Sequence, residues 1–398
     1  MAVTRAAQSS KISPRRENIR EATGEPELDV SVVLPCLNEE ETVAACVEKA
    51  KAWFDHAGVR GEVIVVDNGS LDRSREQALQ AGARVIEEPM RGYGAAHLRG
   101  FRESLGKIIV MADADDTYDL LNLDPLIEPL YNGCDMTIGN RLQNIEPGAM
   151  TWSHRVIGTP AISWLLAIFA GSRVGDSQCG LRAFTREAFE KMELRSRGME
   201  LASEMLLKAF RRDMNVAEVP ISYAVRKGES KLHTFRDGWR HLRFLLLHTP
   251  LYLYLIPGLA LALLGILSLV ITLATTSGVT IGTLTWQPVF AGGILLIVGT
   301  NAMMIGVATH MYAASRGIIL EDGLTDFFRK HVSLERVLGL ALLTIAVGVG
   351  LDGLIFYEWL SGRDLVSTEG MAAVAQTSVI VGANLALGGF LIALMDVE

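Results

Sequence analysis

The chain has 398 residues, of which 49% are hydrophobic, and its mean hydropathy is +0.28. This length suits two domains, and the net charge of −8 argues against a general nucleic-acid-binding protein, which needs a basic face. The four cysteines, Cys36, Cys46, Cys134 and Cys179, form no C-x-x-C pair and no metal-binding spacing. That pattern favours reduced thiols in a cytosolic compartment.

Composition divides the chain into four parts. Residues 1–28 are polar and basic with no early apolar run, so they predict a disordered tail and no signal peptide. An α/β domain is expected over 29–230 and an amphipathic interfacial helix over 231–248. The mostly apolar remainder, 249–398, is expected to be a helical membrane domain.

Strands and helices alternate in the expected α/β domain. Short β-branched runs predict strands at 30–35, 62–67, 83–89 and 107–113, and the segments between them have helical spacing. Near-continuous apolar strands that alternate with helices indicate a mostly parallel, Rossmann-like sheet. Such sheets bind ligands at the carboxyl ends of their strands, so the residues that follow the strands are candidates for a site.

Acidic residues follow three of these strands. The stretch MADADDTYDL at 111–120 places Asp113, Asp115 and Asp116 within four positions, where like charges repel. A divalent cation would make this cluster favourable, because Mg²⁺ and Mn²⁺ prefer carboxylate and phosphate oxygens. A solvated acidic loop is the alternative. Asp67 and Glu39 follow neighbouring strands, and this coincidence favours a metal and nucleotide site.

These motifs resemble those of family 2 glycosyltransferases with a GT-A domain, of the polyprenyl-phosphate glycosyltransferase type (dolichol-phosphate mannose or glucose synthase-like). The resemblance covers residues 29–245. It implies a nucleotide-sugar site made by matching residues: Pro35, Asn38 and Glu39 under the base, Asp67 on the base and Asp113 beside the nucleotide. It also implies that Asp115 binds the metal, with Asp113 and Thr117 as neighbouring ligands. Relatives that complete the metal shell at this last position carry Gln.

The segment RGYGAAHLRG, at 91–100, resembles the family's glycine-rich turn into a helix. The resemblance gives Gly92 and Gly94 a role on the donor side, where small residues let backbone amides approach an anion. It is not a P-loop, and Tyr93 stands where many relatives have lysine. A tight structural turn is the alternative role for these glycines.

The acceptor side is expected in the second half of the α/β domain. By resemblance, Arg141, Arg155 and Thr159 hold a lipid phosphate, and a planar guanidinium suits that task. Residues 156–170 carry no charge and are too short to span a bilayer. Their composition favours an interfacial helix, and a buried core helix is the alternative.

Three further segments match the family pattern. Asp176 in DSQCGLRAF is the candidate base or orienting carboxylate, although a phosphomonoester with a second pKa of about 6 hardly needs a base. Glu204, on the predicted helix 198–210, is the acid expected to face the sugar. Arg226, Ser230 and Lys231 in RKGESKL are expected to grip the diphosphate or the acceptor phosphate.

Four apolar blocks are long enough to span a bilayer, at about 249–273, 287–311, 335–360 and 371–395. Basic residues precede the first block and occur between the second and third, whereas the connection between the first two has no charge. The positive-inside rule therefore predicts a multi-pass protein of the cell membrane with a cytoplasmic catalytic domain.

Together, the residues and the resemblance predict an inverting, metal-dependent hexosyltransferase. Its expected substrates are a nucleotide-diphosphate sugar, with UDP-glucose the first choice and GDP-mannose the second, and membrane polyprenyl phosphate. Its expected cofactor is Mg²⁺ or Mn²⁺, nucleic acid is not a partner, and homo-oligomerisation is left open. Two alternatives are transfer to a glycolipid or polysaccharide hydroxyl, which would need a true base, and a non-catalytic membrane scaffold.

Overall fold

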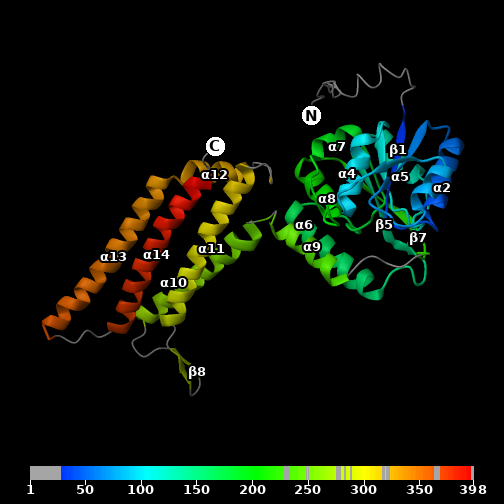
Figure 1. Ribbon diagram of the computed structural model, residues 1–398. Coiled ribbons are helices and arrows are strands. Elements are labelled where there is room, and N and C mark those ends of the chain that lie inside the picture. Colours follow the sequence, from blue (N-terminus) through cyan, green and yellow to red (C-terminus); the bar gives the residue numbers. More distant parts are fainter. Residues whose placement is uncertain are drawn as a thin grey trace, which may run out of the picture. The chain divides into compact units, whose positions relative to one another are not determined.

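Figure 1 shows the computed structural model of the chain. It describes residues 28–227, 234–247, 249, 251–274, 279–281, 284–286, 289–315, 319, 323–362 and 368–395. The chain divides into two compact units, Met1–Leu245 and Leu246–Glu398, called here the α/β unit and the helical unit. The predicted tail at 1–28 lies almost wholly outside the described residues.

In the part that the structure describes, the α/β unit contains a seven-stranded sheet. Its strands are β1 (Val30–Cys36), β2 (Gly61–Asp67), β3 (Arg84–Glu87), β4 (Ile108–Met111), β5 (Met136–Ile145), β6 (Arg182–Thr185) and β7 (Val216–Tyr223). Their order across the sheet is β3-β2-β1-β4-β6-β5-β7. Only β6 among them is antiparallel to its neighbours, β4 and β5. The predicted mostly parallel sheet is therefore confirmed.

Helices cover both faces of this sheet (Figure 1). They include α2 (Val43–Ala57), α3 (Ser74–Gln80), α4 (Tyr93–Glu103), α5 (Asp124–Tyr131), α7 (Arg186–Met192) and α8 (Leu201–Arg211). The central strands are apolar on both sides because both sides are covered, as in other doubly wound sheets. Trp53 on α2 and Phe101 on α4 are among the largest side chains in the core that results.

The register of the parallel strands determines which residues share the carboxyl edge. Cys36 pairs with Asp67 across β1 and β2, and Val33 pairs with Met111 across β1 and β4. The residues that follow Cys36, Asp67 and Met111 therefore emerge at one edge of the sheet. This edge is where the sequence predicts the site.

A π-helical turn, η1 (His154–Gly158), leads into α6 (Thr159–Ala170). The combined helix is apolar but shorter than the four candidate spans. Large apolar side chains recur on its exposed side, among them Trp152, Val156, Ile157 and Trp164. It is thus not a fully buried core helix, and this exposure is in line with the interfacial helix that the composition favours.

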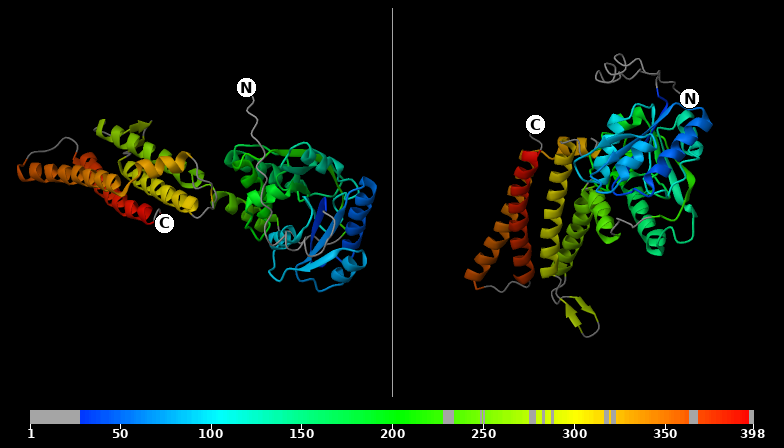
Figure 2. Two further views of the ribbon diagram at one scale, coloured as in Figure 1. Left: turned by 90° about the horizontal axis from the view of Figure 1, so that it is seen from above. Right: turned by 45° about the vertical axis from the view of Figure 1, so that its right-hand side comes forward.

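Among its described residues, the helical unit contains four helices that are long and apolar enough to cross a membrane, as predicted. Its elements are η2 (Leu251–Leu255), α10 (Ile256–Ala274), a hairpin of β8 (Val279–Ile281) and β9 (Leu284–Trp286), α11 (Val289–Ser315), α12 (Gly323–His331), α13 (Leu334–Leu360) and α14 (Thr368–Met395). Figure 2 shows α10 beside α11 and α13 beside α14. Gly265 and Gly292 let the backbones of α10 and α11 approach closely.

Candidate active site

The acidic residues that follow β1, β2 and β4 gather at the carboxyl edge of the sheet. Arg226, which follows β7, joins two of these strand ends. Its Nη2 donates to Glu39 Oε1 at 2.8 Å, and its Nη1 lies 3.3 Å from Asp115 Oδ2. The structure therefore brings together three residues that sequence analysis selected from distant segments.

The half-buried Asp113 lies next to the buried Asp115. Burial and the charge of Asp115 together raise the pKa of Asp113 to about 7. The Tyr93 hydroxyl donates to Asp113 Oδ1 at 2.9 Å and partly opposes this rise. The two neighbouring carboxylates repel each other when both are ionised. A divalent cation bound between them would offset this repulsion.

Asp116 has different partners from the other two aspartates of the cluster. Lys49 Nζ lies 2.6 Å from its Oδ1 and Lys227 Nζ lies 2.7 Å from its Oδ2. Burial alone would raise its pKa, but the hydrogen bonds from both lysines lower it. The charge of the third aspartate is thus neutralised within the chain, and a metal is not needed to explain it.

The candidate metal ligands are Asp113 and Asp115. Thr117 Oγ1 donates to Asp115 Oδ1 at 2.6 Å, so Thr117 orients this carboxylate. Among the described residues, no group of three or more His, Cys, Asp or Glu side chains is arranged to hold a metal. Two carboxylates nevertheless fit Mg²⁺ or Mn²⁺, which usually take one or two protein carboxylates and complete their shell with phosphates and waters.

The residues predicted at the nucleotide base lie where β1 and β2 end. Pro35 is within β1, and Asn38 follows it in a left-handed conformation with φ +53°. Asn38 Oδ1 accepts from Leu71 N at 2.8 Å, and Asp67 Oδ1 accepts from Ser70 N at 3.0 Å. The first bond fixes the two strand-end loops against each other, and the second orders the loop after β2, which together pre-organise this side of the site.

The predicted anion-binding role of the glycine-rich turn is not what its contacts support. A Cβ on Gly92 would collide with the Arg197 carbonyl oxygen, and one on Gly94 would meet the carbonyl oxygens of Ser196 and Gly198. The amide of Ala95, in the first turn of α4, donates to the Arg197 carbonyl oxygen. The glycines make room for the chain's own backbone, so the structural alternative accounts for both.

Gly94→Ala is expected to destabilise the α/β unit by about 1–3 kcal/mol, because backbone atoms must move to admit the new methyl group. Gly158→Ala is the matched control, since the nearest atom to its Cβ would be His154 Cδ2 at 3.6 Å. Thermal unfolding of both purified variants checks this expectation. Equal midpoints for Gly94→Ala and wild type would show that the packing around this turn is loose.

Arg141 and Asp176 form a buried, forked ion pair. Arg141 Nε donates to Asp176 Oδ2 at 2.7 Å and its Nη2 donates to Oδ1 at 2.9 Å. The backbone amides of Arg141 and Gln178 donate to the same carboxylate, which has no exposed surface. A carboxylate occupied in this way orients Arg141 and is poorly placed to act as a base.

The other predicted acceptor residues lie on the η1–α6 helix. Arg155 is exposed on η1, and Thr159 is buried as the first residue of α6. Ser163, one turn further on, bonds to Ser177 Oγ at 2.9 Å and thereby ties α6 to the segment that holds Asp176. Arg141 packs over the Tyr223 ring at 5.2 Å. Two more predicted residues, Ser230 and Lys231, lie outside the described residues.

Glu204, predicted to face the sugar, is buried on α8. Its carboxylate accepts from the backbone amides of Arg195 and Ser196, and its Oε1 lies 2.7 Å from Lys208 Nζ. It thereby holds the loop that packs on Gly92 and Gly94. These contacts support an indirect role for Glu204 and do not support contact with the sugar.

His97 on α4 is a buried residue that sequence analysis did not select. Its ring lies between those of Tyr93 and Phe101, with centroids 4.5 and 5.3 Å away. Neither ring nitrogen has a hydrogen-bond partner in the described part of the chain, and burial lowers the pKa of His97 to about 3. The unfolded chain should therefore bind a proton below pH 6.5 that the folded chain excludes.

This difference predicts that the free energy of unfolding falls by about 1.4 kcal/mol per pH unit as pH drops below 6.5 toward 3. His97→Phe should weaken this acid dependence, whereas the exposed His56→Phe should retain it. Unfolding midpoints at pH 7 and pH 5 measure the effect. An identical acid shift in wild type and His97→Phe would contradict the assignment.

An α/β sheet with aspartates at its strand ends and a following set of membrane-length helices defines the class to which the chain belongs. The model of "Glycosyl transferase family 2" matches residues 31–192. The model of "Glycosyltransferase family 2 C-terminal transmembrane region" matches residues 307–396. Together with the relatives below, these matches show that the chain belongs to glycosyltransferase family 2.

Named relatives of this family give the comparison more detail. The chain is 38% identical to the low-salt glycan biosynthesis hexosyltransferase Agl6 of Haloferax volcanii, over 91% of this chain and 88% of that protein. It is 35% identical to a dolichyl-phosphate hexose transferase of the same organism, over 53% of this chain and 89% of that protein. A dolichol-phosphate mannosyltransferase of Pyrococcus furiosus is 31% identical, over 54% of this chain and 63% of that protein.

Proposed function

We propose that this protein is an inverting, metal-dependent hexosyltransferase that moves a hexose from a nucleotide diphosphate to polyprenyl phosphate. UDP-glucose is the proposed donor, and GDP-mannose is the second choice. The observation that carries the proposal is the meeting of Asp113, Asp115 and Arg226 at the carboxyl edge of the sheet. Similarity to relatives named as hexosyltransferase and dolichyl-phosphate hexose transferase supports the sugar and lipid classes.

The donor diphosphate is proposed to bind between the strand-end acids and Arg226. A bound Mg²⁺ or Mn²⁺ would neutralise the diphosphate as it leaves. Asp115, oriented by Thr117, and Asp113 would hold this ion. Arg226, which pairs with Asp115, would turn its guanidinium to the diphosphate oxygens. Pro35, Asn38, Glu39 and Asp67 are proposed to hold the base.

The acceptor phosphate is proposed to bind at Arg141, Arg155 and Thr159. Asp176 occupies two nitrogens of the Arg141 guanidinium and so fixes its plane. A phosphomonoester is mostly a dianion at neutral pH and attacks without a base. The buried, fully hydrogen-bonded Asp176 is compatible with such an acceptor. It does not favour a neutral hydroxyl acceptor, whose proton would have to be removed.

We further propose that the α/β unit works at the cytoplasmic surface of the cell membrane. The exposed apolar side of the η1–α6 helix, including Trp152 and Trp164, would lie in the headgroup region. The exposed Trp239, Arg240 and Arg243 of α9 (Thr234–Leu247) have the composition expected of a helix at an anionic surface. The lipid phosphate would then be held near the donor sugar, and this proximity would account for much of the rate enhancement of hexose transfer.

The proposal is tested with purified full-length protein, Mg²⁺ or Mn²⁺, a short-chain polyprenyl phosphate and a panel of radiolabelled UDP- and GDP-sugars. Label that enters the organic phase from one donor would support the function and identify the sugar. UDP-glucose is the expected donor. Absence of organic-phase label from every donor, with a folded protein that binds nucleotide, would contradict the proposal.

A further inference from the structure

We infer that the helical unit contains a binding site for an anionic phospholipid of the surrounding bilayer. The site is a cavity of about 330 Å³ between α11, α12, α13 and α14. Its volume falls at the lower end of the range for small-molecule sites, about 300–1,000 Å³. The inference concerns this unit alone and does not depend on the proposed transferase activity.

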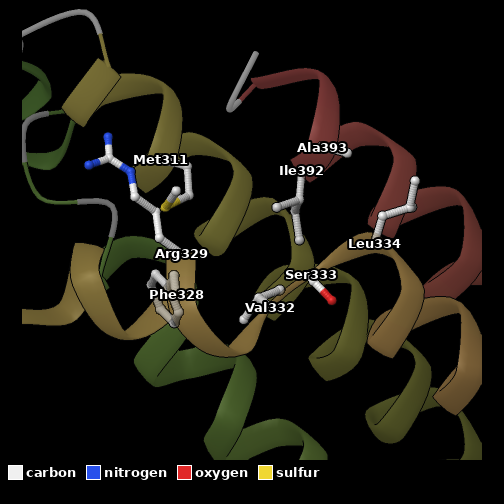
Figure 3. Close-up of a pocket in the computed structure, with 8 residues that line it drawn as sticks. All are labelled: Met311, Phe328, Arg329, Val332, Ser333, Leu334, Ile392 and Ala393. Carbon is white, nitrogen blue, oxygen red and sulfur yellow. The ribbon is translucent and has the colours of Figure 1, made fainter. Parts of the chain in front are cut away.

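The cavity is apolar with a polar edge. Eight residues line it: Met311, Phe328, Arg329, Val332, Ser333, Leu334, Ile392 and Ala393. Figure 3 shows the side chains from α11 and α12 on one side of the space and those from α14 on the other. Six of the eight lining residues are apolar and none is acidic. This lining suits a hydrocarbon chain that ends in an anionic group.

The cavity lies at the membrane–water boundary of the helical unit. It is formed where α11 and α14 approach their C-terminal ends and where α13 begins. Because these three helices are the candidate spans, their ends mark the level of the lipid head groups. A ligand at this level has its phosphate near water and its chain in the hydrocarbon.

One wall of the cavity is closely packed. Met311, Phe328 and Ile392 are buried in one hydrophobic cluster. The buried His310 and Thr325 bond through Nε2 and Oγ1 at 3.1 Å, which fixes α12 on α11. A cavity between well-packed elements is a pre-formed site. Binding there costs little entropy, because few protein side chains have to be ordered.

The rim supplies the charge that a phosphate requires. Arg329 is exposed and lines the cavity, and Lys330, His331 and Arg336 are exposed close by in the chain. Arg336 Nη1 donates to the Lys330 carbonyl oxygen, and Ser333 Oγ caps α13 by accepting from Arg336 N. The described acids in this segment, Asp326 and Glu335, do not line the cavity. Basic pockets between membrane helices are typical sites for anionic head groups.

An abundant bilayer phospholipid is the occupant that these features favour. The lining offers one charged contact and a short apolar space, which match a phosphodiester and the first part of its chain. Bilayer phospholipids are also present at this depth at very high local concentration. The geometry therefore assigns the cavity to a diacyl or diether phospholipid with a net negative charge.

Native mass spectrometry of the full-length protein tests this assignment, with phosphatidylglycerol, phosphatidylcholine and polyprenyl phosphate as separate probes. Phosphatidylglycerol should bind at least about tenfold more tightly than phosphatidylcholine. Ala393→Phe, which fills the cavity, should lower phosphatidylglycerol binding by about tenfold. Leu394→Phe is the matched control, because Leu394 is 71% exposed and does not line the cavity, and it should bind as wild type does.

Arg329→Gln changes an exposed side chain and keeps the test decisive if Ala393→Phe fails to fold. This substitution should weaken the binding of phosphatidylglycerol by about fivefold and leave the binding of phosphatidylcholine unchanged. Equal affinity for the two phospholipids, or wild-type binding by Arg329→Gln, would overturn the assignment. Binding of polyprenyl phosphate in place of phosphatidylglycerol would overturn it too and give the cavity to an acceptor lipid.

Discussion

Asp115→Asn is expected to lower the rate of hexose transfer by about a thousandfold. The change removes one charge from the only pair of carboxylates, among the described residues of the site, that is proposed to hold the divalent cation. Loss of one transition-state electrostatic contact typically costs two to three orders of magnitude, about 3–4 kcal/mol of barrier. Initial rates of label transfer at saturating Mg²⁺ measure this effect.

Asp116→Asn is the matched control for this substitution. Asp116 is the adjacent residue and is equally buried, but its carboxylate pairs with Lys49 and Lys227. Asparagine tolerates its left-handed φ of +60°. The rate should therefore stay within about tenfold of wild type. Equal losses in the two variants, or an unchanged rate in Asp115→Asn, would contradict the assignment of Asp115 to the metal.

The second large effect is expected at Asp176. Asp176→Asn leaves the Arg141 charge buried without its anionic partner, and such a change typically costs about 3–5 kcal/mol of stability. The same substitution should lower transfer, because the guanidinium that holds the acceptor phosphate loses its fixed orientation. Thermal unfolding and transfer rates of the purified variant measure the two effects.

A double substitution separates stability from function at this pair. Arg141→Met with Asp176→Leu replaces the ion pair by apolar side chains, which often restores stability or improves it. Transfer should remain lost, since no guanidinium is left to bind the acceptor phosphate. Recovery of transfer in the stable double variant would show that Arg141 does not hold the acceptor.

Much of the fold could be predicted from the sequence because its signals are local. Uninterrupted β-branched runs indicate buried parallel strands, and long uncharged blocks indicate spans, whatever the rest of the chain does. The meeting of Glu39 and Asp115 followed from one rule, that parallel strands share a carboxyl edge. The antiparallel placement of β6 between β4 and β5 had no such signal in the pattern of strands and helices.

The site partners could not be predicted because they depend on tertiary contacts. Arg141 and Asp176 are 35 positions apart, and Lys227 lies 111 positions from Asp116. The resemblance selected Arg141 and Asp176 one by one, but nothing local indicates that they pair with each other. The glycines at 92 and 94 show a different limit of sequence reasoning. A small-residue motif fits an approaching phosphate and an approaching backbone equally well, and the structure identifies the carbonyl oxygens of 196–198 as neighbours.

The most direct test of the central claim is the intact mass of the lipid product. Purified protein would be incubated with Mg²⁺, UDP-glucose and a short-chain polyprenyl phosphate, with Asp115→Asn as the control. The account predicts a lipid heavier than the acceptor by one hexose residue, formed together with an equal amount of UDP and missing from the control. UDP release with an unchanged polyprenyl phosphate mass, or the same product from Asp115→Asn, would contradict it.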